Sequence, residues 1–250
     1  MQAESSLRKV ALVTGAAQRI GAAIACHLHA AGYDLALHYR HSQAAAQSLR
    51  DQLNVTRADS AHLLQGDLAQ AETPERIVAE TLTHFGRLDA LVNNASTFFD
   101  APLETTTAGQ WDALFAINAR APFLLCQAAA PALRESGGAI VNLTDLHAAR
   151  PRPDILVYAA SKAALEALTR GMATTLGPQV RVNAVAPGAV LWPEGEGDRA
   201  ERQAMLARTP LARTGTALEI AEAVRWLLMD AGFVTGQILR VDGGRDARWV

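Results

Sequence analysis

The segment that decides the fold is VALVTGAAQRIG, residues 10–21. A short apolar run leads into a turn that contains Gly15 and Gly21, and an Ala-rich helical pattern follows. Gly15 permits a tight turn, Gly21 permits close packing of helix on strand, and the start of the helix offers free N–H groups to a pyrophosphate. The glycine pair would also fit a plain structural turn, but its place between two predicted strands favours a dinucleotide site.

The rest of the chain repeats this alternation of strand and helix. Short runs rich in Val, Leu and Ile alternate with longer Ala-rich segments of 3.6-residue periodicity, which is typical of a parallel sheet with helices on both faces. We expect an α/β fold, namely a Rossmann-type doubly wound parallel sheet of about seven strands. The predicted strands are Val10–Thr14, Asp34–Tyr39, Ala61–Gln65, Leu88–Asn93, Ala139–Leu143, Val180–Ala186 and Gln237–Val241. The predicted helices are Ile20–Ala31, Ala44–Leu53, Pro74–Phe85, Gly109–Glu135, Val157–Leu176 and Ala217–Asp230.

The length and the even composition favour one domain over residues 1–250. No linker and no internal repeat divides the chain, and α/β domains of roughly 200 to 250 residues are common. The stretch 191–213 is charged and is interrupted by Pro193, Gly195 and Gly197. Because it directly follows the sixth predicted strand, we expect it to form a mobile lid over the substrate.

The charge balance indicates small-molecule partners. The chain has 23 Lys plus Arg against 25 Asp plus Glu, a net charge of −2, and no basic run, which argues against nucleic acid or an anionic membrane as partner. The N-terminus lacks a leader pattern, and no uncharged apolar run reaches the length of a membrane span. Cys26 and Cys126 suit buried free thiols in a reducing compartment. We expect a cytoplasmic protein without a metal site.

The end of the second predicted strand favours NADPH over NADH. An enzyme that prefers NAD carries a carboxylate there for the ribose 2′-hydroxyl, and this chain has none. Arg40 can instead pair with the oxygens of a 2′-phosphate, since a guanidinium matches phosphate in a bidentate way. The alternative is a solvated strand end that happens to carry an arginine. The segment concerned is His38, Tyr39, Arg40, His41 and Ser42.

Tyr158 and Lys162 form the candidate reactive pair. They lie four positions apart on a predicted helix, so that their side chains share one face. Lys9 and Lys162 are the only lysines, which suggests that Lys162 was selected for its compact ammonium. An ammonium nearby would lower the pKa of Tyr158 and make the phenol a better general acid. A purely structural pair is the alternative. Asp145 follows the fifth predicted strand, where it could also be a simple cap.

Further motifs complete a resemblance to the classical short-chain dehydrogenase/reductases over about Lys9 to Gly244. They are Asp67, Asn93-Asn94-Ala95, Asn118, Pro187-Gly188 and Val241-Asp242-Gly243-Gly244. The resemblance implies that Tyr158 donates a proton, that Lys162 tunes it and holds the nicotinamide ribose, and that Asn118 anchors a proton relay through a water. It also implies that Asp67 meets the adenine and that the protein is a homotetramer. The implied cofactor residues are Gly15, Arg19, Ile20, Gly21, His38, Tyr39, Arg40, His41, Ser42, Asp67, Leu68, Asn94, Ala95, Ser96, Tyr158, Lys162, Pro187 and Gly188.

Two departures from the common family pattern narrow the resemblance. Arg19 replaces the usual central glycine of the first turn, and Asp145 replaces the usual serine thirteen positions before the tyrosine. With Ser96-Thr97-Phe98, these residues resemble the pteridine reductases and the short-chain-type dihydromonapterin and dihydrofolate reductases of bacteria. That resemblance implies that Arg19 reaches phosphate and substrate, and that Phe98 covers a pterin. The implied substrate residues are Arg19, Ser96, Phe98, Asp145 and Tyr158, and the implied catalytic residues are Asp145, Tyr158, Lys162 and Asn118.

The function expected from these residues is NADPH-dependent reduction of a dihydropteridine to its tetrahydro form. The substrate would be of the dihydrobiopterin, dihydromonapterin or dihydrofolate type. Reduction of a ring C=N bond adds hydride to carbon and a proton to nitrogen, and a carboxyl at Asp145 can bind an aminopyrimidine ring. Phe98 would form one wall of an aromatic slot, or else belong to the core. The alternatives are a reductase of a carbonyl, such as a 3-ketoacyl thioester or a sugar, and a non-catalytic nucleotide sensor or scaffold.

Overall fold

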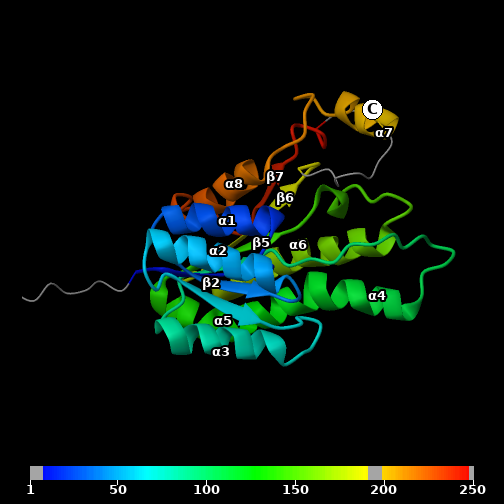
Figure 1. Cartoon of the computed structure of the whole chain (residues 1–250). Coiled ribbons are helices and arrows are strands. Elements are labelled where there is room, and N and C mark those ends of the chain that lie inside the picture. Colours follow the sequence, from blue (N-terminus) through cyan, green and yellow to red (C-terminus); the bar gives the residue numbers. More distant parts are fainter. Residues whose placement is uncertain (1–7, 191–198, 248–250) are drawn as a thin grey trace, which may run out of the picture.

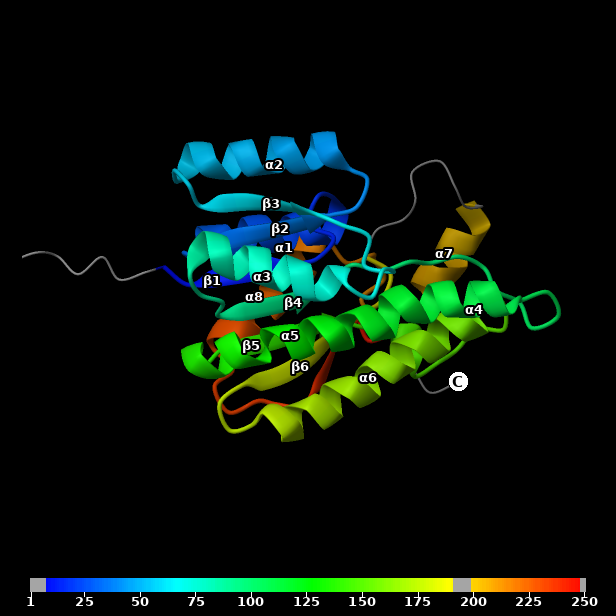
Figure 2. The same cartoon turned by 90° about the horizontal axis from the view of Figure 1, so that it is seen from below.

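The computed structural model describes residues 8–190 and 199–247. Seven strands are found at β1 Val10–Val13, β2 Asp34–Tyr39, β3 Ala61–Gln65, β4 Ala90–Asn93, β5 Ala139–Leu143, β6 Arg181–Pro187 and β7 Ile238–Val241. They pair in parallel in one sheet of order β3-β2-β1-β4-β5-β6-β7, which Figure 2 shows from below. The strand order reverses after β3, which is the arrangement of a doubly wound sheet. The predicted fold class is confirmed.

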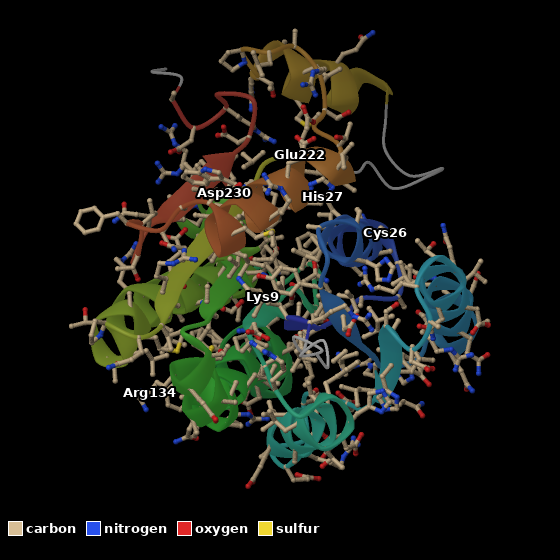
Figure 3. The ribbon with its side chains drawn as sticks, turned by 90° about the vertical axis from the view of Figure 1, so that its left-hand side faces the viewer. Lys9, Cys26, His27, Arg134, Glu222 and Asp230 are labelled. Atoms are coloured by element: carbon tan, nitrogen blue, oxygen red, sulfur yellow. The ribbon has the colours of Figure 1, made fainter. Side chains whose placement is uncertain are left out.

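Helices cover both faces of the sheet (Figure 1). Helices α1 Arg19–Ala30, α2 Gln43–Thr56 and α8 Ala217–Met229 pack on one face, whereas α3 Thr73–Phe85, α5 Ala121–Ser136 and α6 Leu156–Leu176 pack on the other. Figure 3, seen from the amino ends of the strands, shows Cys26 of α1 and Arg134 of α5 on opposite sides of Lys9, which precedes β1. The alternation within β1 explains the two cores, because Ala11 and Val13 face one and Val10 and Leu12 the other.

The long predicted helix Gly109–Glu135 has an interruption that the sequence pattern did not show. It consists of α4 Ala108–Phe115, a π-helical turn Ala116–Arg120 and then α5. A single wide turn adds one residue to the ladder and leaves the apolar periodicity nearly unchanged, so periodicity cannot reveal it. Such turns are frequent at functional sites, and this one carries Asn118.

The stretch predicted as a lid is only partly described. Residues 191–198 lie outside the described residues, and α7 Arg199–Ala207 occupies much of the remainder. This helix was not predicted, since its pattern is short and charged. The chain then turns at Thr209, which is buried and packs against Gly243. Whether the stretch moves over a substrate stays a prediction.

One described helical stretch is long and apolar enough to cross a membrane. It is Ala108–Ser136, whose most apolar window has a mean hydropathy of 1.3, and charged residues interrupt it so that it contains no long uncharged run. Within its most apolar window, 61% is buried inside the protein, as in the core helix of a globular fold. The buried side chains of α5, such as Leu125 and Leu133, belong to the core beneath the sheet.

The parallel register brings the residues that follow β1, β2, β4 and β5 to one edge of the sheet. Val13 lies beside Leu37 and Val92, and Asn93 lies beside Asn142. The Gly15 turn and the segments that begin at Asn94 and Thr144 therefore emerge close together, at the carboxyl ends where open α/β sheets bind ligands.

Candidate functional site

A groove of about 480 Å³ runs along this edge of the sheet. It gathers most of the residues that the sequence indicated for a nucleotide, from β1, β2 and β4. Its lining contains arginines but no Asp or Glu, so its charge suits an anion. Ala17, Gln18, Thr97 and Ile117 also line it and were not predicted. The predicted residues in the lining are Gly15, Arg19, Ile20, Gly21, His38, Tyr39, Arg40, His41, Ser42, Leu68, Asn94, Ala95 and Ser96.

A hydrogen-bonded clamp joins the first turn to the end of β4. The hydroxyl of Thr14 accepts the N–H groups of Asn94 at 2.9 Å and Ala95 at 3.0 Å. The amide of Asn94 donates to the carbonyl of Thr14 at 2.8 Å. A Cβ on Gly21 would lie 2.1 Å from the carbonyl oxygen of Gly15, so only glycine lets α1 pack this closely on the turn. The predicted role of Gly21 in helix packing is thus visible in the structure.

His38 supports this turn from below. Its ring is buried; Nδ1 accepts the N–H of Gly15 at 3.2 Å, and Nε2 lies 3.0 Å from the carbonyl oxygen of Gly66. Burial lowers the pKa of His38 to about 4, so the ring is neutral at physiological pH. Since Nδ1 accepts, Nε2 carries the proton and donates it to Gly66. His38 is therefore a neutral side chain that holds the Gly15 turn in position. The sequence had predicted it only as a residue that contacts the cofactor.

The end of β2 provides a second anion-binding feature. The side chain of Arg40 is half exposed, and its guanidinium lies 3.7 Å from Oδ1 of Asp67, which also accepts the N–H of Ala69. Ser42 is the N-cap of α2, and its side chain makes no capping hydrogen bond. The positive end of a helix dipole thus lies beside Arg40, as a phosphate would require.

Arg19 has a backbone conformation that suits glycine better. Its φ is 55°, in the left-handed region, and its side chain is exposed in the groove. A side chain in that region costs about 1–2 kcal/mol. The common family pattern has a glycine at this position, and the backbone keeps the conformation that suits glycine although the residue is an arginine. Backbone strain that is kept at such a position indicates that the side chain has a function.

Asp145 and Tyr158 meet at the end of β5. The phenol of Tyr158 donates a hydrogen bond to Oδ2 of Asp145 at 2.9 Å, and Oδ1 of the same carboxylate accepts the N–H of His147 at 2.8 Å. The second bond caps the 3-10 turn Leu146–Ala148. Asp145 is therefore both the cap that was one interpretation of the sequence and a partner of the proposed proton donor.

The expected effect of Lys162 on Tyr158 is wrong. Burial and the neighbouring charge of Asp145 raise the pKa of Tyr158, so the phenol keeps its proton across the physiological range. Lys162 is itself buried, and its ammonium donates to the carbonyl of Leu143 at 2.9 Å, 5.9 Å from the centre of the tyrosine ring. Burial also lowers the pKa of Lys162 to about 8. Burial of the phenol and its direct contact with Asp145 set the direction of the shift, whereas the ammonium of Lys162 bonds to a backbone carbonyl and not to the phenol.

Asn118 is tied to protein groups at every polar position of its amide. Its Oδ1 accepts from the hydroxyl of Ser96 at 2.9 Å and from the N–H of Thr97 at 3.0 Å. Its Nδ2 donates to the carbonyl of Thr97 and the hydroxyl of Ser161, both at 3.0 Å. The side chain therefore anchors the segment after β4 to α6, and a relay through Asn118 would have to use its backbone in the π-helical turn.

Phe98 lies at the surface of this site and not in the core. Its side chain is 59% exposed, and its ring meets that of Tyr158 edge-on, with centroids 4.9 Å apart and an interplanar angle of 85°. An exposed aromatic face beside the Tyr158–Asp145 pair is suited to stacking on a flat ring. The interpretation of Phe98 as a core residue is wrong.

The remaining predicted residues lie outside the lining of the groove. A Cβ on Gly188 would come within 2.7 Å of the Cα of Asp242, so Pro187-Gly188 allows the ends of β6 and β7 to approach closely. Asp67 lies at the rim beside Arg40.

Both cysteines are free thiols; Cys126 is buried, with its pKa raised to about 12 by burial, whereas Cys26 is only partly buried.

The chain is similar to known proteins over nearly its whole length. Residues 15–246 match a family model described as enoyl-(acyl carrier protein) reductase. The chain is 36% identical to the 3-oxoacyl-(acyl-carrier-protein) reductase FabG of Staphylococcus aureus strain Mu50, covering 95% of this chain and 98% of that one. It is 35% identical to pteridine reductase 1 of Leishmania tarentolae, covering 94% and 95%. A solved blue fluorescent protein from a metagenomic library, in complex with NADPH, superposes with a TM-score of 0.89 at 36% identity over 95% of this chain and 97% of that one.

Proposed function

Because the chain belongs to the short-chain dehydrogenase/reductase family, we propose that it is an NADPH-dependent reductase whose substrate is a dihydropteridine. The observation that carries the substrate class is the 2.9 Å hydrogen bond from Tyr158 to Asp145 beside the exposed ring of Phe98. A carboxylate in place of an oxyanion donor does not suit a carbonyl substrate, because it repels the negative charge that develops on oxygen. It does suit a ring that offers N–H donors.

The residues of the groove fit NADPH. The start of α1 and the Gly15 turn would bind the pyrophosphate, and Arg40 with the uncapped start of α2 would bind the 2′-phosphate. Lys162, whose ammonium donates to the carbonyl of Leu143 at the end of β5, would contact the nicotinamide ribose. Bound NADPH would supply the hydride. The similar structure in complex with NADPH supports this assignment.

The chain's own residues would hold and deliver the proton. The phenolic Oη of Tyr158 retains its proton because burial and Asp145 raise its pKa. A ring nitrogen that gains basicity as hydride arrives at the adjacent carbon can take that proton from the Tyr158–Asp145 pair. Asp145 can also accept a hydrogen bond from the 2-amino group of a pterin, and Phe98 can exclude water from one face of the ring.

Reduction of a 3-ketoacyl thioester is the second candidate. The similarity to FabG over nearly the whole chain favours it, and the Tyr158–Lys162 pair would serve either reaction. Asp145 opposes it for the reason given above. A non-catalytic nucleotide sensor on this fold would have no need for the buried ammonium of Lys162 beside a proton-bearing phenol.

The test is NADPH oxidation by the purified protein on a panel of dihydrobiopterin, dihydromonapterin, dihydrofolate and acetoacetyl thioester. The proposal predicts a kcat/KM at least tenfold higher on one of the pterins than on the thioester. Preference for the thioester would overturn it in favour of a ketoacyl reductase. Turnover of none of these compounds, with NADPH still bound, would favour the sensor.

The proposal includes a cytoplasmic homotetramer, which rests on the family resemblance. An apolar groove of about 760 Å³ between α5 and α6 offers a surface for a second copy of the chain, with Ala167 exposed within it. Ala167→Glu would place a charge there and should lower the mass measured by light scattering. An unchanged mass would assign assembly to another face.

A further inference from the structure

The segment after β7 returns to the edge of the sheet that carries Asp145. Gly243 and Gly244 have positive φ values of 65° and 83° and turn the chain there. The N–H of Leu211 donates to the carbonyl of Gly243 at 3.1 Å, which ties this turn to the segment after α7. Figure 1 shows the two segments together beyond the carboxyl ends of the strands. Arg245 follows directly.

A second tie joins this turn to the loop of Asp145. Arg150, five residues beyond Asp145, donates to the carboxylate of Asp246 at 2.5 Å and to its backbone carbonyl at 2.6 Å. Asp246 also pairs with Arg240 at 2.8 Å. Arg245 therefore lies between two anchored residues, Gly243 and Asp246, in a segment that is tied to the loop of Asp145.

The acids beside Arg245 are engaged elsewhere. The two oxygens of Asp242 accept the N–H groups of Gly244 at 2.9 Å and Asp246 at 2.7 Å. The carboxylate of Asp246 forms ion pairs with Arg150 and Arg240. Across residues 8–190 and 199–247, no carboxylate forms an ion pair with the guanidinium of Arg245 within 4 Å, although that side chain is partly buried.

The surroundings of Arg245 are rich in positive charge. Burial lowers its pKa, and the charges of Arg152 and Arg208 lower it further, while Asp145 and Asp242 act in the opposite sense. Arg152 pairs with Asp154, whereas no ion pair within the described part of the chain involves Arg208. Arg152 and Arg208 therefore lie near enough to Arg245 to act on it electrostatically, as does Asp145; we call the three arginines the arginine cluster.

A partly buried cation without a salt-bridge partner is unfavourable unless something compensates it. A ligand anion would do so, and charge-assisted hydrogen bonds from guanidinium to carboxylate or phosphate are among the stronger polar contacts in proteins. Asp145 lies near enough to act on Arg245 electrostatically, but within residues 8–190 and 199–247 it forms no ion pair with Arg245 within 4 Å. Asp145 and Arg245 lie near enough to interact electrostatically, so a substrate held by that carboxylate would bring its substituents near the cluster.

We propose that Arg245, assisted by Arg208 and Arg152, is a subsite for an anionic substituent of the substrate. The inference rests on the proposed function and refines it. The preferred substrate is a dihydropterin whose side chain carries a phosphate or a carboxylate. Arg245 determines specificity through KM and takes no part in hydride or proton transfer, because it contacts neither Tyr158 nor Lys162.

The experiment compares neutral and anionic pterins on Arg245→Gln, which keeps a polar side chain but removes the charge. Dihydrobiopterin and dihydroneopterin are the neutral substrates, dihydroneopterin monophosphate tests a phosphate, and dihydrofolate tests carboxylates. Arg225→Gln is the matched control, because Arg225 lies on α8 and pairs with Asp230 at the surface. We expect Arg245→Gln to raise KM for at least one anionic pterin about tenfold or more. The kcat should be unchanged, and kcat/KM for the neutral pterins should stay within about twofold.

The outcomes separate this inference from the proposed function. If the parent reduces neutral pterins and Arg245→Gln leaves the preference between neutral and anionic pterins unchanged, the subsite is wrong and the proposed function stands. An equal loss on both kinds of pterin would also overturn it, since that indicates a structural role. If the parent reduces no pterin at all, both the proposed function and the subsite are wrong.

Discussion

Replacement of Arg19 by glycine should stabilise the protein while it impairs the enzyme. Arg19 has a φ of 55°, and its side chain is exposed. Relief of the left-handed strain yields about 1–2 kcal/mol. The greater freedom of glycine in the unfolded chain takes back about 0.5–1 kcal/mol. The expected net gain is about 0–1.5 kcal/mol, or a rise in Tm of up to about 6 °C for a chain of this size.

The assay is thermal unfolding of the ligand-free protein, paired with kcat/KM for dihydrobiopterin under NADPH. Arg19→Gly should lose about tenfold or more in kcat/KM, the value of a hydrogen bond from a charged donor. Arg19→Ala is the matched control, because it keeps the Cβ and the strain but loses the guanidinium; its activity should fall without any gain in Tm. Destabilisation by Arg19→Gly, or full activity in either variant, would refute the functional interpretation of the strain.

Three further perturbations test other parts of the site. Tyr158→Phe should reduce kcat by about 100-fold or more with NADPH affinity retained, as for loss of a general acid; near-normal turnover would contradict the assignment. Turnover should fall as pH rises through about 8, because the buried ammonium of Lys162 loses its proton there while Tyr158 keeps its own, and this alkaline limb should be absent in Lys162→Met. Arg40→Ala should reduce the preference for NADPH over NADH by about 1–3 kcal/mol, measured as the ratio of kcat/KM values, and an unchanged ratio would exclude contact with the 2′-phosphate.

The sheet and its helices could be predicted because their periodicities are strong. Each predicted strand is found within two residues of its expected bounds, since buried parallel strands form short apolar runs between turns. The π-helical turn at Asn118 escaped prediction because one extra backbone residue hardly alters an Ala-rich pattern. Helix α7 escaped because its sequence is short and charged, and tertiary packing of its end at Thr209 decides its place.

The site was predictable where a local motif fixes it and not where distant segments meet. The spacing of Tyr158 and Lys162 predicted that both lie on one helix. The family resemblance predicted that Asp145 belongs to the same site. The direction of the pKa shift at Tyr158 was missed, because it depends on burial of the phenol and on its contact with a carboxylate thirteen residues away. The proximity of Arg245 to Asp145 was missed for the same reason. It depends on a hydrogen bond between Arg150 and Asp246, which lie far apart in the sequence.

The role of Asp145 is the most direct test of the proposed chemistry. The measurement is kcat/KM for dihydrobiopterin and for acetoacetyl thioester, compared between the parent and Asp145→Ser. Serine removes the carboxylate that binds Tyr158 and restores an oxyanion donor. We expect the parent to prefer the pterin and Asp145→Ser to lose most of this activity while it still binds NADPH. A parent that prefers the thioester, with a serine variant that gains on the thioester and loses nothing on the pterin, would contradict it.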